Sequence, residues 1–468
     1  MGTELWSSSA KELATRIASR EVSSREVVEA HLARIEQVNE HLNALTVIMA
    51  EAAIDLADAA DAATSAGEEL GPLHGVPFTI KENLDVAGGA TTQGMPAMAD
   101  ALVAVDAPVV ERMRAAGAVP LARTNLPEMG LRISTNNPLR GLTRNPWHPE
   151  LTAGGSSGGE ASALASGMSP IGLGNDLGGS LRNPAYCCGI TALKPTSPGR
   201  IPLASSLPPE DPPLGIQLMA TDGPMARRVA DLRLGLEVLS GWHPRDPRSV
   251  TAPLEAPPAA RRAAIVTEIP GAMLDDELVV AVRLAGEALA DAGYEVGETG
   301  PPELDRCHEM WARVLTPDIA IMLGELEPIM TPPAVALLRH LLDWYPPDEV
   351  PAALVHMERA RLGRAWSAFL ADHPVVVMPV WTGPPFEHDA DIAGPDGARL
   401  TLDMLRPITV GNLLGIPSVA VPTGVSDGLP RGVQVYAERW AEQRCLDAAE
   451  AIEAAVGVIT PIDPVTST

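Results

Sequence analysis

"GPLHGVPFTIKENLDVAGG", residues 71–89, contains the pattern that indicates the fold class. Glycines and a proline mark a turn at its start, and residues 76–80 form a short apolar run that is typical of a strand. The loop that follows begins at Lys81, so this lysine lies at the carboxyl end of the expected strand. A helix over about 107–117 and a strand over 118–122 are expected next.

Two later apolar runs, "HPVVVMPV" (373–380) and "IPSVAVPTG" (416–424), predict further buried strands. Strands that alternate with helices predict an α/β fold, in which helices cover both faces of one sheet. Ligands of such folds bind at the carboxyl ends of the strands. Lys81 is therefore placed where a ligand would bind.

The N-terminal part of the chain is expected to be helical over about residues 1–66. Ser23 and Glu26 have the spacing of a capping box, and apolar residues then recur every three or four positions from Val28 to Val38. An alanine-rich helix is expected over 50–66. No internal repeat or linker divides the sequence, so a single domain over 1–468 is predicted. Two proline-rich stretches, 204–213 and 382–400, are expected to be irregular loops.

The composition excludes several classes of partner. The chain is 46% apolar and 20% charged, which is typical of a globular protein, and its formal net charge of -26 argues against binding to nucleic acid or to an anionic membrane. No signal peptide and no apolar run of membrane-spanning length are seen, so a cytoplasmic protein is expected. The cysteines lack metal-ligand spacing and are expected to be reduced and mostly buried: Cys187, Cys188, Cys307 and Cys445.

Lysine is rare in this chain, because only Lys11, Lys81 and Lys194 occur among 34 basic residues. A lysine can lose its proton when it is desolvated, whereas an arginine stays protonated. Lys11 is expected on an exposed helix, where chance explains it. Lys81 at a strand end is a candidate base.

The glycine-rich stretch "LTAGGSSGGEASAL" (151–164) admits several interpretations. A linker is disfavoured because helix-forming sequence resumes at once, and a phosphate loop is disfavoured because Glu160 stands where a lysine is needed. Gly154, Ser156 and Gly158 match the G-x-S-x-G pattern of a nucleophile elbow, which also requires a strand before it. The preceding "HPELTAGG" is a poor strand.

A second glycine-flanked serine, Ser180, lies in "PIGLGNDLGGSLRNPAYCCGITALKPTSPGR" (170–200). The backbone N–H groups around it could converge on one point, as an oxyanion hole requires. These groups belong to Leu177, Gly178, Gly179 and Ser180. Lys81, Ser156 and Ser180 thus form a candidate catalytic constellation.

The sequence closely resembles the amidase signature family over nearly its whole length. The similar segments include "GPLHGVPFTIKENLDVAG", "GLTRNPWHPELTAGGSSGG", "GNDLGGSLRNPA", "TDGPMARRVADL" and "NLLGIPSVAVPTG", in the family's order. The resemblance implies one domain around a large mixed sheet and an amidohydrolase with a Ser-cisSer-Lys triad. Ser180 would be the acyl nucleophile, Ser156 the bridging serine in a cis peptide, and Lys81 the base.

The resemblance also implies supporting roles for Ser157, Asp176 and Arg182, although the last two could be an ordinary ion pair. Asn175 stands where the family usually has Thr or Ser, and Ala153 replaces a common proline. Neither residue is expected to touch the triad, so activity should survive.

The substrate is less well defined by the sequence. By position in the family, Met129 and Gly130 should line the acyl pocket, and Met310, Trp311, Met322 and Met330 either line an apolar site or belong to the core. An apolar or aryl carboxamide, or an anilide, is the favoured substrate. No metal or organic cofactor is expected, and a homodimer is left open.

Three alternatives remain at this point. One is a glutaminase-like subunit of a tRNA amidotransferase, which would need partner subunits and a charged pocket. Another is an esterase of the α/β-hydrolase type that uses Ser156 with a histidine such as His373 or His388. A binding protein without catalysis is the third.

Overall fold

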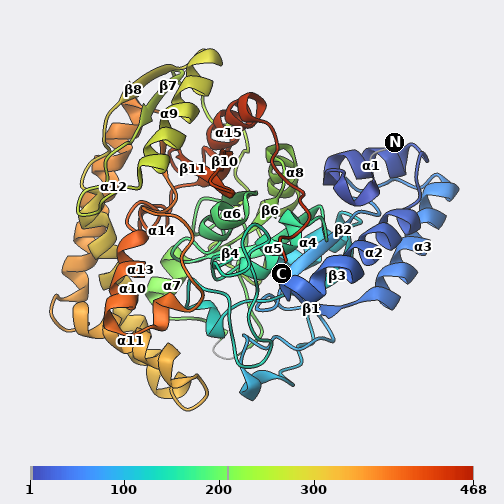
Figure 1. The fold of residues 1–468 in the computed structure, drawn as a ribbon, viewed down its shortest axis with the longest axis horizontal. Coiled ribbons are helices and arrows are strands. Elements are labelled where there is room, and N and C mark those ends of the chain that lie inside the picture. The colour runs from blue at the N-terminus through green and yellow to red at the C-terminus, as the bar shows by residue number, and fades with distance from the viewer. Residues whose placement is uncertain (1–3, 208–209, 467–468) are drawn as a thin grey trace.

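The computed structural model describes residues 4–207 and 210–466, which form one mixed sheet of 11 strands with helices on both faces (Figure 1). The strand order is β1-β3-β2-β4-β6-β5-β10-β11-β9-β7-β8. The strands are β1 (Leu45–Ile48), β2 (Pro77–Lys81), β3 (Val119–Thr124), β4 (Ile171–Asp176), β5 (Thr191–Lys194), β6 (Thr221–Ala226), β7 (Arg262–Ile265), β8 (Glu295–Glu298), β9 (Val375–Pro379), β10 (Ser418–Ser426) and β11 (Leu429–Tyr436).

The α-helices are α1 (Ala10–Ala18), α2 (Ser24–Leu42), α3 (Ala50–Ala66), α4 (Pro108–Ala115), α5 (Gly158–Ala165), α6 (Arg182–Cys188), α7 (Leu214–Met219), α8 (Val229–Leu239), α9 (Asp276–Asp291), α10 (Leu304–Leu326), α11 (Pro332–Trp344), α12 (Ala352–Asp372), α13 (Pro395–Met404), α14 (Val410–Leu414) and α15 (Glu442–Val456). Short 3-10 helices are η1 (Leu5–Ser7), η2 (Pro96–Met98), η3 (Glu128–Gly130) and η4 (Ala390–Ile392). None of the described helices is long and apolar enough to cross a bilayer.

The two faces of the sheet belong to two different parts of the core. Side chains alternate along a strand, so Val375 and Val377 of β9 pack with helices α1, α4, α8, α9 and α15, while Val376 and Met378 pack with α5, α6 and α10–α14. Burial of both faces explains the continuous apolar strands of the sequence. A third cluster joins α2 and α3 to β3, at the opposite end of the sheet from β7 and β8.

The predicted α/β fold is confirmed, and most expected elements lie within a few residues of the observed ones. Ser23 and Glu26 form the predicted capping box at the start of α2. Two expectations were wrong. Strand β1 interrupts the helical N-terminal segment, and α13 begins at Pro395, inside the stretch 382–400 that was expected to be irregular. The first residue of a helix tolerates proline because its N–H has no helical partner.

Candidate active site

Three parallel strands bring the polar residues of the site to one edge of the sheet. Strand β2 pairs in parallel with β3 on one side and with β4 on the other, so all three carboxyl ends meet there. Lys81 is the last residue of β2, and Asn175 and Asp176 end β4. Strand β6 runs antiparallel to β4, and its register places Asp222 opposite Asn175. This edge is where α/β sheets bind ligands.

Lys81 is fully buried, and its amine makes two short contacts. Its Nζ lies 2.6 Å from Ser156 Oγ and 2.6 Å from Asn175 Oδ1. Asn175 Nδ2 in turn donates to Asn83 Oδ1 at 3.0 Å. The expectation that Asn175 stays clear of the triad residues was therefore wrong, because this amide replaces the usual hydroxyl as a direct partner of the lysine.

Burial lowers the pKa of Lys81 to about 7, because the charged ammonium is disfavoured away from water. The carboxyl groups of Asp176, Asp222 and Glu160 oppose this shift. Burial raises the pKa of Asp222 to about 8 and that of Glu160 to about 7, so both acids are themselves reluctant to ionise. A substantial fraction of the amine can therefore be neutral near pH 7.

The two acids differ in their hydrogen bonds. Glu160, in the first turn of α5, accepts from the hydroxyls of Thr79 and Thr124. Neither carboxyl oxygen of Asp222 has a hydrogen-bond partner within the part of the chain that the structure describes. Asp222 therefore influences Lys81 through its charge.

Ser156 lies in the turn that leads into α5, and the Gly155–Ser156 peptide bond is cis, as the family resemblance implied. Its hydroxyl faces Gly130, where an added Cβ would lie 3.2 Å from Ser156 Oγ. Because Gly130 also has a positive φ of 64°, a side chain there would be both strained and crowded against the serine. No strand precedes Ser156, which agrees with the sequence-based objection to a nucleophile elbow.

Ser180 lies in the loop between β4 and α6, and 9% of its surface is exposed. The Ser157 N–H donates to the carbonyl of Ser180 at 3.2 Å, which ties the two serine loops together. Ser157 Oγ also donates to the carbonyl of Asn175 at 3.4 Å. Among the described residues, no hydrogen bond joins Ser156 Oγ to Ser180 Oγ.

Asp176 organises the loop that carries Ser180. Its carboxylate accepts the N–H of Gly179 at 2.7 Å and that of Leu181 at 3.1 Å. Gly179 was predicted as an oxyanion donor, but its N–H is thus directed at Asp176 here. Leu177, Gly178 and Ser180 are the remaining candidates from that prediction.

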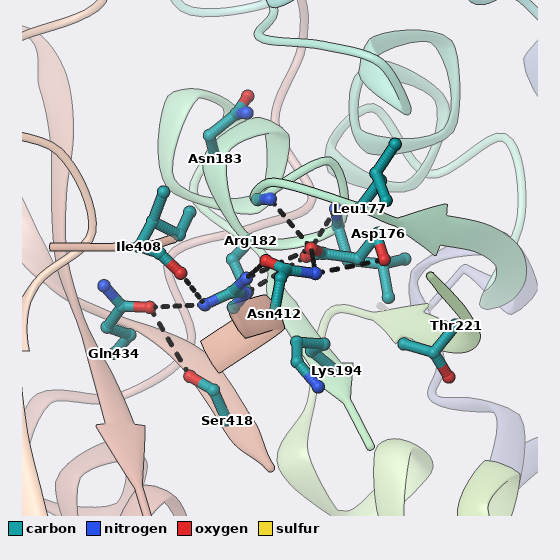
Figure 2. Close-up of polar contacts among 12 residues, drawn as sticks. Asp176, Leu177, Arg182, Asn183, Lys194, Thr221, Ile408, Asn412, Ser418 and Gln434 are labelled. Atoms are coloured by element: carbon teal, nitrogen blue, oxygen red, sulfur yellow. Dashed lines mark hydrogen bonds and ion pairs between the residues drawn. The ribbon is translucent and has the colours of Figure 1, made fainter. Parts of the chain in front are cut away.

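The Asp176–Arg182 pair is completely buried, with Nε to Oδ2 at 3.0 Å. Burial disfavours both charges, but the guanidinium holds the pKa of Asp176 well below its usual range. Figure 2 shows Arg182 between Asp176 and Gln434, with Asn412 beside both charged groups. Arg182 donates to Asn412, Gln434 and the carbonyl of Ile408, so the loop is fixed from segments far along the chain.

A cavity opens at Ser180 and is mostly apolar. Its walls come from the loops 130–133 and 177–180 and from α10, α11 and α13, which lie together in Figure 1. The side chains include Trp311, Leu315 and Ile319 of α10 and Leu338 and Trp344 of α11. Its two charged lining residues, Arg132 and Asp391, are paired with each other at 2.9 Å.

The structure separates the residues that were proposed for the substrate pocket. Gly130 and Trp311 line the cavity. Met129 packs beside the core, Met310 and Met330 are buried in it, and Met322 lies at its edge. The four cysteines are buried free thiols, as expected.

The two histidines of the esterase alternative lie elsewhere. His388 Nε2 lies 2.8 Å from the carbonyl of Pro149, and His373 stacks on Phe369 at the end of α12. Neither contributes to the cavity at Ser180, so the geometry does not support that alternative.

Several residues of the site were not found from the sequence. Asn83 and Trp344 belong to no motif, and Asp222 gains its meaning only from the register of β4 with β6. The asparagine after "IKE" could have been noticed as a polar residue close to Lys81 in the same loop.

Comparisons with known proteins agree with this site. An indoleacetamide hydrolase from Bradyrhizobium diazoefficiens is 40% identical over 467 residues, covering 97% of this chain and 88% of that protein. One of the subunits of the glutamyl-tRNA(Gln) amidotransferase from Salinispora arenicola is 33% identical and covers 98% and 99%. The solved structure of 6-aminohexanoate cyclic dimer hydrolase with its substrate has a TM-score of 0.83 and 29% identity, covering 97% and 98%. The amidase family model matches residues 26–446, so the chain belongs to the amidase signature family and is an amide-cleaving hydrolase.

Proposed function

We propose that this enzyme hydrolyses a small apolar or aryl carboxamide through an acyl-enzyme on Ser180, with Ser156 as the relay and Lys81 as the base. The observation that carries the proposal is the buried amine of Lys81, 2.6 Å from Ser156 Oγ, beside an apolar cavity that opens at Ser180. Asn175 Oδ1 can only accept a hydrogen bond, so it holds an N–H of the lysine. The lone pair of the neutral amine is then free to face Ser156.

In the first step the neutral Lys81 takes the proton of Ser156, which takes the proton of Ser180 as Ser180 Oγ attacks the amide carbon. The tetrahedral intermediate collapses when the C–N bond breaks, and the proton returns from Lys81 through Ser156 to the leaving nitrogen. Water then enters, loses a proton by the same route and attacks the acyl-enzyme. The acid leaves, and Ser180 regains its proton.

The developing oxyanion needs backbone donors near Ser180. The N–H groups of Leu177, Gly178 and Ser180 serve this role in our proposal, while Gly179 keeps its N–H on Asp176. Asp176 therefore supports the loop and contacts no substrate. Arg182 neutralises that carboxylate, and so keeps a second negative charge from weakening the oxyanion site.

The cavity walls favour an apolar acyl group. Two tryptophans and several leucines surround the space next to Ser180, and burial of such a group stabilises the complex by about 25 cal/mol per Å². The similarity to an indoleacetamide hydrolase makes an arylacetamide the first substrate to test. The leaving group would then be ammonia.

The amidotransferase alternative requires recognition of glutamine, whose α-ammonium and α-carboxylate need charged partners. The charged residues of the cavity are already engaged, since Arg132 donates to both oxygens of Asp391 and also to Asp389. An apolar amide needs neither charge to be released. The wall therefore favours the hydrolase over a glutaminase-type function.

A panel of indole-3-acetamide, phenylacetamide, alkyl amides, anilides and glutamine tests the proposal with the isolated chain. We expect ammonia release from the aryl amides without ATP or tRNA, and a mass shift equal to the acyl group on Ser180 after rapid acid quench. The Ser180→Ala variant should lose both. Turnover of glutamine only with added subunits, or an adduct on Ser156, would overturn the proposal.

A further inference from the structure

Trp311 contacts the proposed oxyanion loop as well as lining the cavity. Its indole Nε1 donates to the carbonyl of Leu177 at 3.0 Å. The same ring lies against Gly178, because a Cβ added there would be 2.5 Å from Trp311 Cζ2. The tryptophan therefore holds this peptide by a hydrogen bond and by direct packing.

The hydrogen bond fixes the direction of a neighbouring donor. The cis peptide bonds of the described residues lie elsewhere, so the Leu177–Gly178 bond is trans. In a planar trans peptide the C=O and the following N–H point in opposite directions. While Trp311 holds the carbonyl of Leu177, the N–H of Gly178 must point away from the indole.

Rotation of this peptide would be easy without such a contact, because glycine accepts many backbone conformations. A rotated peptide would present its carbonyl oxygen where the N–H had been. That oxygen would repel the developing negative charge, so a single peptide flip converts a stabilising dipole into a destabilising one.

The indole is itself held firmly. Trp311 is 6% exposed and stacks on His308, whose Nδ1 lies 3.2 Å from Thr409 Oγ1. The next part of the loop is supported separately: Ile408 packs against Gly179, and Asp176 binds the N–H of that glycine. The loop is thus fixed at two successive peptides from two different directions.

We infer that Trp311 is a positioning residue, which sets the Leu177–Gly178 peptide so that the N–H of Gly178 serves the oxyanion. This inference rests on the proposed acyl-enzyme at Ser180. It assigns Trp311 an effect on transition-state stabilisation that is distinct from its place in the cavity wall.

The test uses Trp311→Phe, which keeps an aromatic ring but removes the N–H donor. Trp344→Phe is the matched control, because Trp344 lines the same cavity and stacks on His340, away from this loop. With an aryl amide that the native enzyme hydrolyses, Trp311→Phe should lower kcat by about 10-fold or more, since removal of one oxyanion donor costs about 10² to 10³. KM should change little. Trp344→Phe should change KM and leave kcat nearly unaltered.

Two further measurements separate positioning from general damage to the fold. An aryl trifluoromethyl ketone, which forms a tetrahedral adduct with serine, should lose affinity for Trp311→Phe in proportion to kcat/KM, while the product carboxylic acid should bind as before. The pH at which the rate reaches half its maximum should not move.

Equal weakening of both inhibitors, or a rise in KM at unchanged kcat, would overturn the inference and leave Trp311 as cavity wall only. The same preparation of Ser180→Ala distinguishes the two proposals. If that variant stays active, the acyl-enzyme mechanism is wrong. If it is inactive while Trp311→Phe keeps its kcat, only the role of Trp311 is wrong.

Discussion

The ionisation of Lys81 determines how the rate should depend on pH. Its pKa is lowered from 10.5 to about 7 by burial. At pH 7 roughly half of the enzyme then carries the neutral amine, against roughly one molecule in 3,000 for an unshifted lysine. This structure therefore makes about 10³-fold more base available at neutral pH than an exposed lysine would.

The assay is kcat/KM for an aryl amide between pH 5 and 10, followed by ammonia release. The rate should rise about tenfold per pH unit below pH 7 and level off above about pH 8, because protonation of Lys81 removes the base. Lys81→Arg keeps a positive charge but has no neutral form at these pH values. It should lose about 10² to 10⁴ in kcat, as should Lys81→Ala.

Circular dichroism and thermal melting of each variant provide the control for folding. A rate that stays flat from pH 5 to 9 would refute the assignment of Lys81 as the base. So would a folded Lys81→Arg variant that keeps most of its activity.

Asp222→Asn removes a carboxylate that raises the pKa of the catalytic amine, so the rising limb of the pH profile should move to lower pH; an unmoved or higher midpoint would contradict this. Gly178→Ala places a Cβ 2.5 Å from Trp311 Cζ2 and should lower kcat by at least about 10-fold in a protein that still melts cooperatively; native activity would argue against a tightly set loop. His373→Ala and His388→Ala should leave kcat for amides unchanged, and loss of activity in either would reopen the Ser-His alternative.

Local patterns predicted the elements that local physics controls. The capping box at Ser23 and the apolar run before Lys81 each depend on residues close in sequence, and both were confirmed. The boundary at Lys81 was one residue early, because its backbone still pairs with β3. Strand β1 was missed since its pairing partner, β3, lies about 80 residues further along the chain.

The chemistry of the site could be predicted only in part. The serines stand out through their glycines, and Lys81 through the rarity of lysine. Their electrostatic environment could not be predicted, since Asp222 reaches the site through strand register and Glu160 through packing of α5 on the sheet. The engagement of Gly179 by Asp176 also depends on the loop conformation, which the glycine pattern permits but does not specify.

The long reach of Arg182 has a consequence for synthesis on the ribosome. Its partners Asn412 and Gln434 are 230 and 252 residues further along the chain. When the loop with Ser180 has emerged, those partners have not yet been translated, so the guanidinium has only part of its final environment. A nascent or prematurely terminated chain therefore carries both serines and the lysine but lacks part of the support of the nucleophile loop. The cell is thus spared an amide-cleaving activity until translation is nearly complete.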